Sequence, residues 1–259
     1  MEKLRQQIEQ RLSAVTGDAC FYYENLATGV CFGHAADKPV VAASVIKLAV
    51  LIEAFRQMDA DAVRANEMFV IARTDKLPSC GALNYLHDGL CVTFRDLCVL
   101  MTILSDNTAT NLLIKRLGIG NINDTLRMLG AEKMTLNRLL FDREASSRGI
   151  ENYITAREAG LLLKRLYDGE AVSGPASEDM LSILKDQRLN GKIPFLLPHS
   201  VKIAHKTDED DGITHDVGIV YARQPFIVCF CGEHVSPPEF ERAMQDITLM
   251  LYENAERIR

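Results

Sequence analysis

The chain has 259 residues, of which 47% are hydrophobic and 25% charged, and its 29 basic and 35 acidic residues give a formal net charge of −6. With a mean hydropathy of −0.00, this composition is typical of a globular protein and excludes a disordered or collagen-like chain. The acidic surplus argues against nonspecific binding to nucleic acid or to an anionic membrane, so we expect neither as a partner.

The N-terminal part of the chain predicts one helix and two strands. Leu4, Ile8, Leu12 and Val15 recur at helical spacing and indicate an amphipathic helix over residues 2–15. Strands are expected over 19–24 and 30–32. Between about residues 44 and 200 the pattern becomes helical. The expected helices cover residues 45–56, 93–104, 109–117, 121–129, 156–167 and 177–185.

The C-terminal part returns to strands and ends in a helix. Residues 201–206, 217–222 and 226–231 are rich in β-branched and aromatic side chains, and an apolar stripe from Phe240 to Leu251 predicts a closing helix. Strands at both ends with helices between them predict an α/β (α+β) fold. In this fold an antiparallel sheet is assembled from both termini, flanked by the terminal helices, and interrupted by a helical insert.

Seven cysteines occur without a C-x-x-C pair and without zinc-like Cys/His spacing, so we expect small buried side chains in a reducing compartment and no metal site. The N-terminal residues lack the apolar segment of a secretory signal, and no window reaches the roughly 18 apolar residues of a membrane span. Unless a leader has been removed, the sequence predicts a cytoplasmic protein.

The tetrapeptide Ser44-Val45-Ile46-Lys47 lies at a predicted loop-to-helix junction. A serine hydroxyl is a weak nucleophile that needs a nearby base, and a lysine with a lowered pKa is able to serve. Lys47 projects from the same helix face as Ser44, whose hydroxyl would lie at the positive end of the helix dipole. Such motifs also arise by chance, and a second one, Ser182 to Lys185, stands in a predicted helix far from other motifs.

Two further motifs follow in the chain. Ser105-Asp106-Asn107 comes directly after the helix predicted to end at residue 104, where these residue types ordinarily cap a helix. Lys206-Thr207 comes in a predicted strand, where a surface pair is the ordinary interpretation. S-x-x-K, S-D-N and K-T in this order are nevertheless the set found in class A β-lactamases and penicillin-binding proteins.

The sequence therefore resembles the class A serine β-lactamases and their penicillin-recognising relatives. The matching segments are AASVIKLAVL, LSDNTATNLLI and AHKTDEDDGITHDVGIV, and ENYITAREAGLLLKRLY resembles the stretch that leaves the family's Ω-loop. The resemblance covers nearly the whole chain. It implies a sheet domain of residues 1–48 and 198–259, an all-α domain of residues 49–197, and an active site in the cleft between them.

The resemblance also implies catalytic roles. Ser44 would be the acylated nucleophile, Lys47 its base or proton relay, and Ser105 the group that passes a proton to the departing nitrogen. The oxyanion hole would use the backbone N–H groups of Ser44 and Glu209. No metal or other cofactor is implied.

The substrate-binding roles follow in the same way. Asn107 would bind the amide side chain of the substrate and hold Lys47, while Lys206 and Thr207 would bind its carboxylate. His205 and the pair His215-Asp216 flank this motif, and because a lysine already supplies the base we expect structural roles for them.

Two departures from the family pattern stand out. Asp208 occupies the place of the glycine in K-T-G, where its bulk and negative charge are unfavourable for an anionic β-lactam, so it either turns away or selects a substrate of different charge. The E-x-x-L-N context of the deacylating glutamate is absent, and Asp142 and Glu144 are the available carboxylates. Without a placed base, Ser44 would acylate and then stall.

The sequence leaves three functions open for a small-molecule amide or β-lactam partner. The first is a serine hydrolase of class A β-lactamase type that acts through an acyl-serine intermediate. The second is an esterase or D-amino-acid peptidase on the same scaffold, and the third is a catalytically idle penicillin-binding or sensor protein. Acylation, turnover and saturable binding distinguish them, and the sequence does not specify the oligomeric state.

Overall fold

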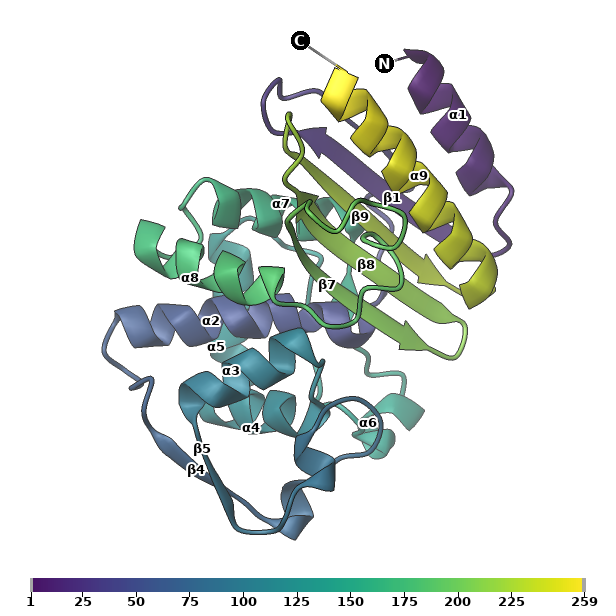
Figure 1. Ribbon diagram of the computed structural model, residues 1–259. Coiled ribbons are helices and arrows are strands. Elements are labelled where there is room, and N and C mark those ends of the chain that lie inside the picture. The colour runs from purple at the N-terminus through teal and green to yellow at the C-terminus, as the bar shows by residue number, and fades with distance from the viewer. Residues whose placement is uncertain (1, 258–259) are drawn as a thin grey trace.

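The computed structural model describes residues 2–257 and contains a five-stranded antiparallel sheet in the order β2-β1-β9-β8-β7 (Figure 1). The N-terminal strands β1 (Asp18–Asn25) and β2 (Cys31–His34) pair with strands from the C-terminal end. The latter are β7 (Ile203–Asp210), β8 (Ile213–Val220) and β9 (Phe226–Glu233). The predicted sheet assembled from both termini is therefore confirmed.

One face of the sheet is covered by the two terminal helices. Helices α1 (Glu2–Ser13) and α9 (Pro237–Arg257) lie side by side on this face (Figure 1). Between helices and sheet the structure buries an aromatic core, because alternate strand residues point to the same side. Its largest members are Phe21, Tyr23, Phe226, Phe230 and Phe240.

The other face carries the helical segment. Helix α7 (Ala156–Tyr167) packs directly on β1, β8 and β9. A side chain at Gly160 would place its Cβ 2.4 Å from the ring of Tyr22, so only glycine permits this close approach of helix to sheet. The remaining long helices are α2 (Lys47–Asp59), α3 (Phe94–Ile103), α4 (Asn107–Leu117), α5 (Ile119–Met128) and α8 (Gly174–Lys185).

The helices predicted from apolar spacing all form, with ends displaced by a few residues, whereas several short elements were not predicted. These are the strand pairs β3 (Val40–Val41) with β6 (Tyr153–Ile154) and β4 (Met68–Ile71) with β5 (Leu90–Thr93), and the short helix α6 (Arg143–Ser147). The segment between the main strands is therefore not purely helical. Its division from the sheet as a separate domain of residues 49–197 remains a proposal.

The seven cysteines are free thiols. Cys20, Cys98, Cys229 and Cys231 are buried as expected, but the expectation of burial is wrong for the other three, Cys31, Cys80 and Cys91. Among residues 2–257 we find no helix with the length and apolar character needed to cross a bilayer.

Candidate active site

Ser44 lies in a single 3-10 turn, η1 (Ala43–Ile46), that leads into helix α2 at Lys47. The α-helix thus begins two residues later than the predicted start at residue 45. Because a 3-10 helix has three residues per turn, Ser44 and Lys47 are one turn apart. Ala43, just before the serine, adopts a left-handed φ of 41°, which favours glycine, and η1 packs against β7.

The ammonium group of Lys47 is buried among polar groups of the S-D-N motif. Its Nζ lies 2.8 Å from the carbonyl oxygen of Ser105, 2.9 Å from the Ser105 hydroxyl and 2.8 Å from Oδ1 of Asn107. Burial, followed by repulsion from Lys206, holds the pKa of Lys47 well below its ordinary value. A lowered pKa favours the neutral amine, which is the form of lysine that is able to accept a proton.

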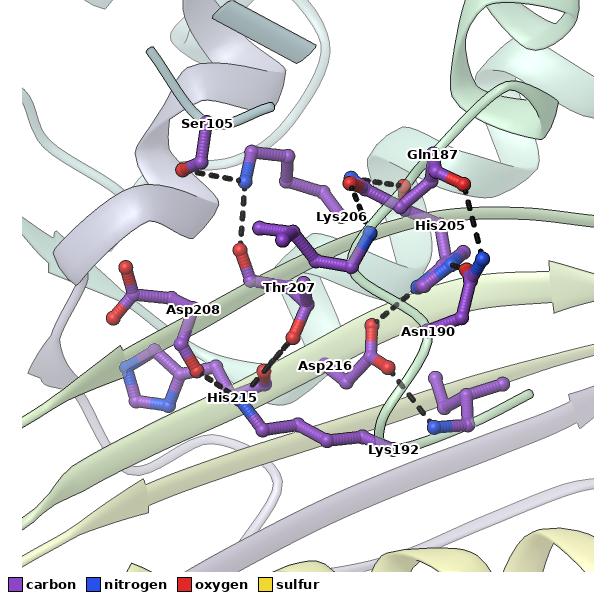
Figure 2. A network of polar contacts seen from close by, with 12 residues as sticks. Ser105, Gln187, Asn190, Lys192, His205, Lys206, Thr207, Asp208, His215 and Asp216 are labelled. Carbon is purple, nitrogen blue, oxygen red and sulfur yellow. Dashed lines mark hydrogen bonds and ion pairs between the residues drawn. The ribbon is translucent and has the colours of Figure 1, made fainter. Parts of the chain in front are cut away.

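The Ser105 hydroxyl lies between two lysines. Besides its contact with Lys47, it is 3.0 Å from Nζ of Lys206, which reaches across from β7 and also donates to the Thr207 carbonyl at 2.6 Å (Figure 2). Ser105 adopts a left-handed φ of 54°, the conformation that places it between the two side chains. Burial lowers the pKa of Lys206 to about 8, so this lysine remains mostly cationic at pH 7.

Asp106 fixes the loop that borders the site. Its Oδ1 accepts a hydrogen bond from the Ala109 amide at 2.9 Å and so caps α4, as the sequence predicted. Its Oδ2 also accepts bonds from the amides of Ala82 and Leu83, at 2.7 and 2.8 Å. A Cβ at Gly81 would lie 2.3 Å from that oxygen, so glycine is required where the loop meets the carboxylate. Local sequence patterns gave no sign of this second role.

Strand β7 presents Thr207 toward Lys192, a residue that the sequence did not single out. The Thr207 hydroxyl donates to the His215 carbonyl at 3.0 Å and lies 3.2 Å from Nζ of Lys192. Lys192 also donates to the backbone carbonyl of Asp208 (Figure 2). A lone lysine in a loop carries no recognisable signal, because only the tertiary structure brings it beside the strand.

The loop that carries Lys192 is fastened to the sheet by a buried histidine and aspartate. Nδ1 of His205 is 2.9 Å from Oδ1 of Asp216, and its Nε2 is 3.0 Å from Oδ1 of Asn190 (Figure 2). The other oxygen of Asp216 accepts the Ile193 amide at 3.0 Å. These contacts hold the loop on the sheet and agree with the structural roles expected for His205 and Asp216.

A cavity of about 370 Å³ opens in front of Ser44. Four residues predicted for the site line it: Ser44, Asn107, Asp142 and Asp208. A second cavity of about 310 Å³ is lined by Ser105, Thr207, Lys192 and again Asp208. Asp208 therefore belongs to both halves of the cleft. The backbone of Glu209 pairs with Thr214 in the sheet, and its side chain lies outside the described residues.

Three carboxylates lie on the segment of residues 137–151, which contains α6, ends before β6 and is called the Ω-like loop below, and they differ in their surroundings. Asp142 lines the cavity and caps α6, with Oδ1 accepting the Ala145 amide at 3.0 Å. Glu144 points to solvent with 85% of its side chain exposed, does not line the cavity, and lies 3.9 Å from Arg148. Glu151, which the sequence did not single out, lines the cavity.

Both oxygens of Glu151 are occupied. One accepts hydrogen bonds from the guanidinium of Arg138, 2.9 Å from its Nε, and the other accepts the Ser146 hydroxyl. Of the cavity-lining carboxylates on this loop, Asp142 is the one that keeps an oxygen not used in a hydrogen bond among the described residues. Such an oxygen is what a water molecule in the cleft would need.

The chain and its structure are similar to those of known proteins. A model described as the beta-lactamase enzyme family matches residues 3–255. The structure of a beta-lactamase from Sphaerobacter thermophilus DSM 20745 superposes with a TM-score of 0.90 at 28% identity, covering 100% of this chain and 98% of that one. PBP-A is similar with a TM-score of 0.90 at 26% identity, covering 100% and 97%. An L158E mutant of PBP-A, solved as an acyl-enzyme complex with penicillin G, has a TM-score of 0.89 at 26% identity, with coverage of 100% and 98%.

Proposed function

The chain belongs to the beta-lactamase enzyme family, and from this we propose that it is a serine hydrolase of class A β-lactamase type that opens β-lactam or related amide bonds through an acyl-enzyme on Ser44. The observation that carries the proposal is the pair of buried lysines on one serine hydroxyl. Ser105 Oγ lies 2.9 Å from Nζ of Lys47 and 3.0 Å from Nζ of Lys206. Lys47 is one helical turn from Ser44, the serine that lines the cavity.

In the proposed acylation, the neutral amine of Lys47 accepts the proton of Ser44 as its oxygen attacks the carbonyl carbon. The C–N bond then breaks, and the departing nitrogen takes a proton from the Ser105 hydroxyl. The contact between Lys47 and Ser105 supports this relay, because the proton gained by the lysine is able to return to Ser105. The backbone N–H groups of Ser44 and Glu209 stabilise the oxyanion, each by about 2.7–4 kcal/mol.

The same geometry supports the proposed substrate contacts. Asn107 lines the cavity in front of Ser44 and is positioned to bond the amide of the acyl group. We place the substrate carboxylate in the second cavity, where the Thr207 hydroxyl and the Lys192 ammonium lie 3.2 Å apart. There it would compete with Glu241, 3.5 Å from Lys192, and with the His215 carbonyl that accepts the Thr207 hydroxyl. Charge-assisted bonds of this kind are stronger than neutral ones.

For deacylation we assign the base to Asp142 rather than to Glu144. Asp142 lines the cavity with an oxygen that the α6 cap does not use, whereas Glu144 is exposed and outside the cavity. Asp142 would take a proton from water as that water attacks the acyl carbonyl, and the ester bond to Ser44 would break.

Intact-mass time courses with penicillin G and nitrocefin test the proposal. We expect a covalent adduct on the protein that disappears as hydrolysed product accumulates, and we expect Ser44→Ala to form no adduct. Failure of every β-lactam to add mass, or an adduct that persists in Ser44→Ala, would contradict the assignment.

A second candidate, a penicillin-binding protein that keeps its acyl group, is favoured by the Ω-like loop. Both oxygens of Glu151 are engaged, and Asp142 is one methylene shorter than glutamate. In this case the same time course would end at a stable adduct, in which each protein molecule carries one covalently bound, ring-opened antibiotic and no free product accumulates.

A further inference from the structure

The cleft in front of Ser44 carries a surplus of carboxylates. Its charged lining consists of Arg138, Arg143, Asp142, Glu151, Asp208 and Asp210. Arg138 is already paired with Glu151. Among the residues that the structure describes, Asp142, Asp208 and Asp210 form no ion pair within 4 Å. Arg143 is the other cation of this lining, and the charge of Asp208 also acts on the buried Lys47 and Lys206, so the lining has a net negative charge with cations nearby.

Asp208 is the most constrained of these carboxylates. Its Oδ2 is buried and has no hydrogen-bond partner among the described residues. The ammonium of Lys192 bonds the backbone carbonyl of Asp208, and no dashed line reaches the carboxylate group in Figure 2. A buried carboxylate oxygen without a donor destabilises the protein unless a ligand supplies one. The position is therefore suited to a ligand that brings an ammonium group.

The two cavities differ in the placement of their charges. In the second cavity the ammonium of Lys192 lies beside Thr207 and 3.5 Å from Glu241, and Asp208 is shared with the cavity in front of Ser44. Thr207 points toward Lys192 in the second cavity, where the proposed function puts the substrate carboxylate. Asp208 and Asp210, two residues apart and hence on one face of β7, line the cavity of Ser44 and Asn107, where the acyl group lies. A substrate with a carboxylate on the leaving side and a cation on the acyl side matches both halves.

We propose that Asp208 determines specificity for substrates whose acyl group carries an ammonium ion. This inference rests on the proposed function and names its substrate class: zwitterionic amides or β-lactams, with the ammonium near Asp208 and the carboxylate near Thr207 and Lys192. The aspartate that replaces the family's glycine then has a role in selecting charge.

Three penicillins that differ in one substituent test the proposal. Carbenicillin, penicillin G and ampicillin carry a carboxylate, a hydrogen and an ammonium on the same side-chain carbon. The second-order rate of Ser44 acylation is measured for each by intact mass at about pH 6, where the ammonium is protonated. The proteins are the wild type, Asp208→Asn, Asp208→Ser, and Asp211→Asn as a matched charge control, because Asp211 is exposed and lines neither cavity.

In the wild type we expect ampicillin to acylate fastest and carbenicillin slowest. The ampicillin-to-carbenicillin ratio should be about tenfold or more above that of Asp208→Asn, since charges a few ångströms apart interact strongly in a partly buried site. Asp208→Ser should reduce the ratio equally, and Asp211→Asn should keep it within about twofold because an exposed charge is screened. Dividing the wild-type ratio by the Asp208→Asn ratio removes the differences in intrinsic β-lactam reactivity between the two penicillins.

Two results would overturn the inference while leaving the proposed function standing. One is a ratio that Asp208→Asn does not change. The other is a loss of acylation that is equal for all three penicillins, which would mean that Asp208 acts on the lysines and not on the substrate. If none of the three forms an adduct on any variant, the proposed function itself fails, and the inference fails with it.

Discussion

The buried cation of Lys206 leads to a prediction about stability as a function of pH. Its side chain is 1% exposed, and burial lowers its pKa from the ordinary 10.5 to about 8. Between these two values the folded protein has released the proton while the unfolded chain still holds it. Because the unfolded state then binds more protons, the free energy of unfolding rises with pH in this window.

The magnitude follows from the two pKa values. Raising the pH from about 7 to about 9.5 should stabilise the wild type by about 2 kcal/mol relative to Lys206→Met, which has no group to titrate. The repulsion between Lys206 and Lys47 acts in the same direction, since it lowers the pKa of Lys47 in the wild type and is relieved in the variant. At pH 7 the variant is free of the cost of burying this ammonium group.

Urea unfolding followed by far-ultraviolet circular dichroism measures this difference, because the chain has no tryptophan to serve as a fluorescence probe. Both proteins are unfolded at several pH values, and the wild-type stability minus the variant stability is plotted against pH. A difference that stays constant or falls with pH would refute the argument that Lys206 is a buried lysine with a lowered pKa.

Two further substitutions test the loops around the cleft. Asp106→Ala removes three hydrogen bonds from backbone amides to the carboxylate. It should lower the free energy of unfolding, measured by urea denaturation, by about 3 kcal/mol or more. A loss below about 1 kcal/mol would contradict the role given to Asp106. Asp142→Asn keeps the oxygen that caps α6. It should lengthen the lifetime of the covalent adduct by about 100-fold, because deacylation slows, and should change the rate of acylation little. A larger effect from Glu144→Gln would refute the choice of base.

The fold was predictable because long elements carry their own periodicity. The apolar stripe from Phe240 to Leu251 and the strands rich in β-branched residues each contain enough positions for a period to appear. Strands of two residues are too short to show a period. Val40–Val41 pairs with Tyr153–Ile154 only because the Ω-like loop brings these two segments together. The positions of such elements are set by tertiary contacts.

The candidate site was predictable only in part, for a similar reason. The three motifs lie on elements far apart in the chain, and their order resembled that of a known family, which was enough to expect Lys47, Ser105 and Lys206 near one another. In the structure both lysines are within hydrogen-bonding distance of the Ser105 hydroxyl. Lys192 and Glu151 come from loops whose residue types fit any solvated surface. They reach the cleft through the contacts of other residues, in particular the fastening of the loop by Asp216.

The site also contains several energetically unfavourable features, namely left-handed backbone conformations at residues other than glycine and buried charged side chains. Ala43 and Ser105 adopt left-handed φ values of 41° and 54°, each costing about 1–2 kcal/mol, and two lysines are buried close together. The hydrophobic cores on both faces of the sheet offset these costs, since neither core contains a site residue. A protein selected for stability alone would have glycine at the two strained positions and apolar side chains at the lysines. Local costs of this kind are typical of functional sites, and the Oδ2 of Asp208, buried without a hydrogen-bond partner among the described residues, adds another such cost in the same cleft.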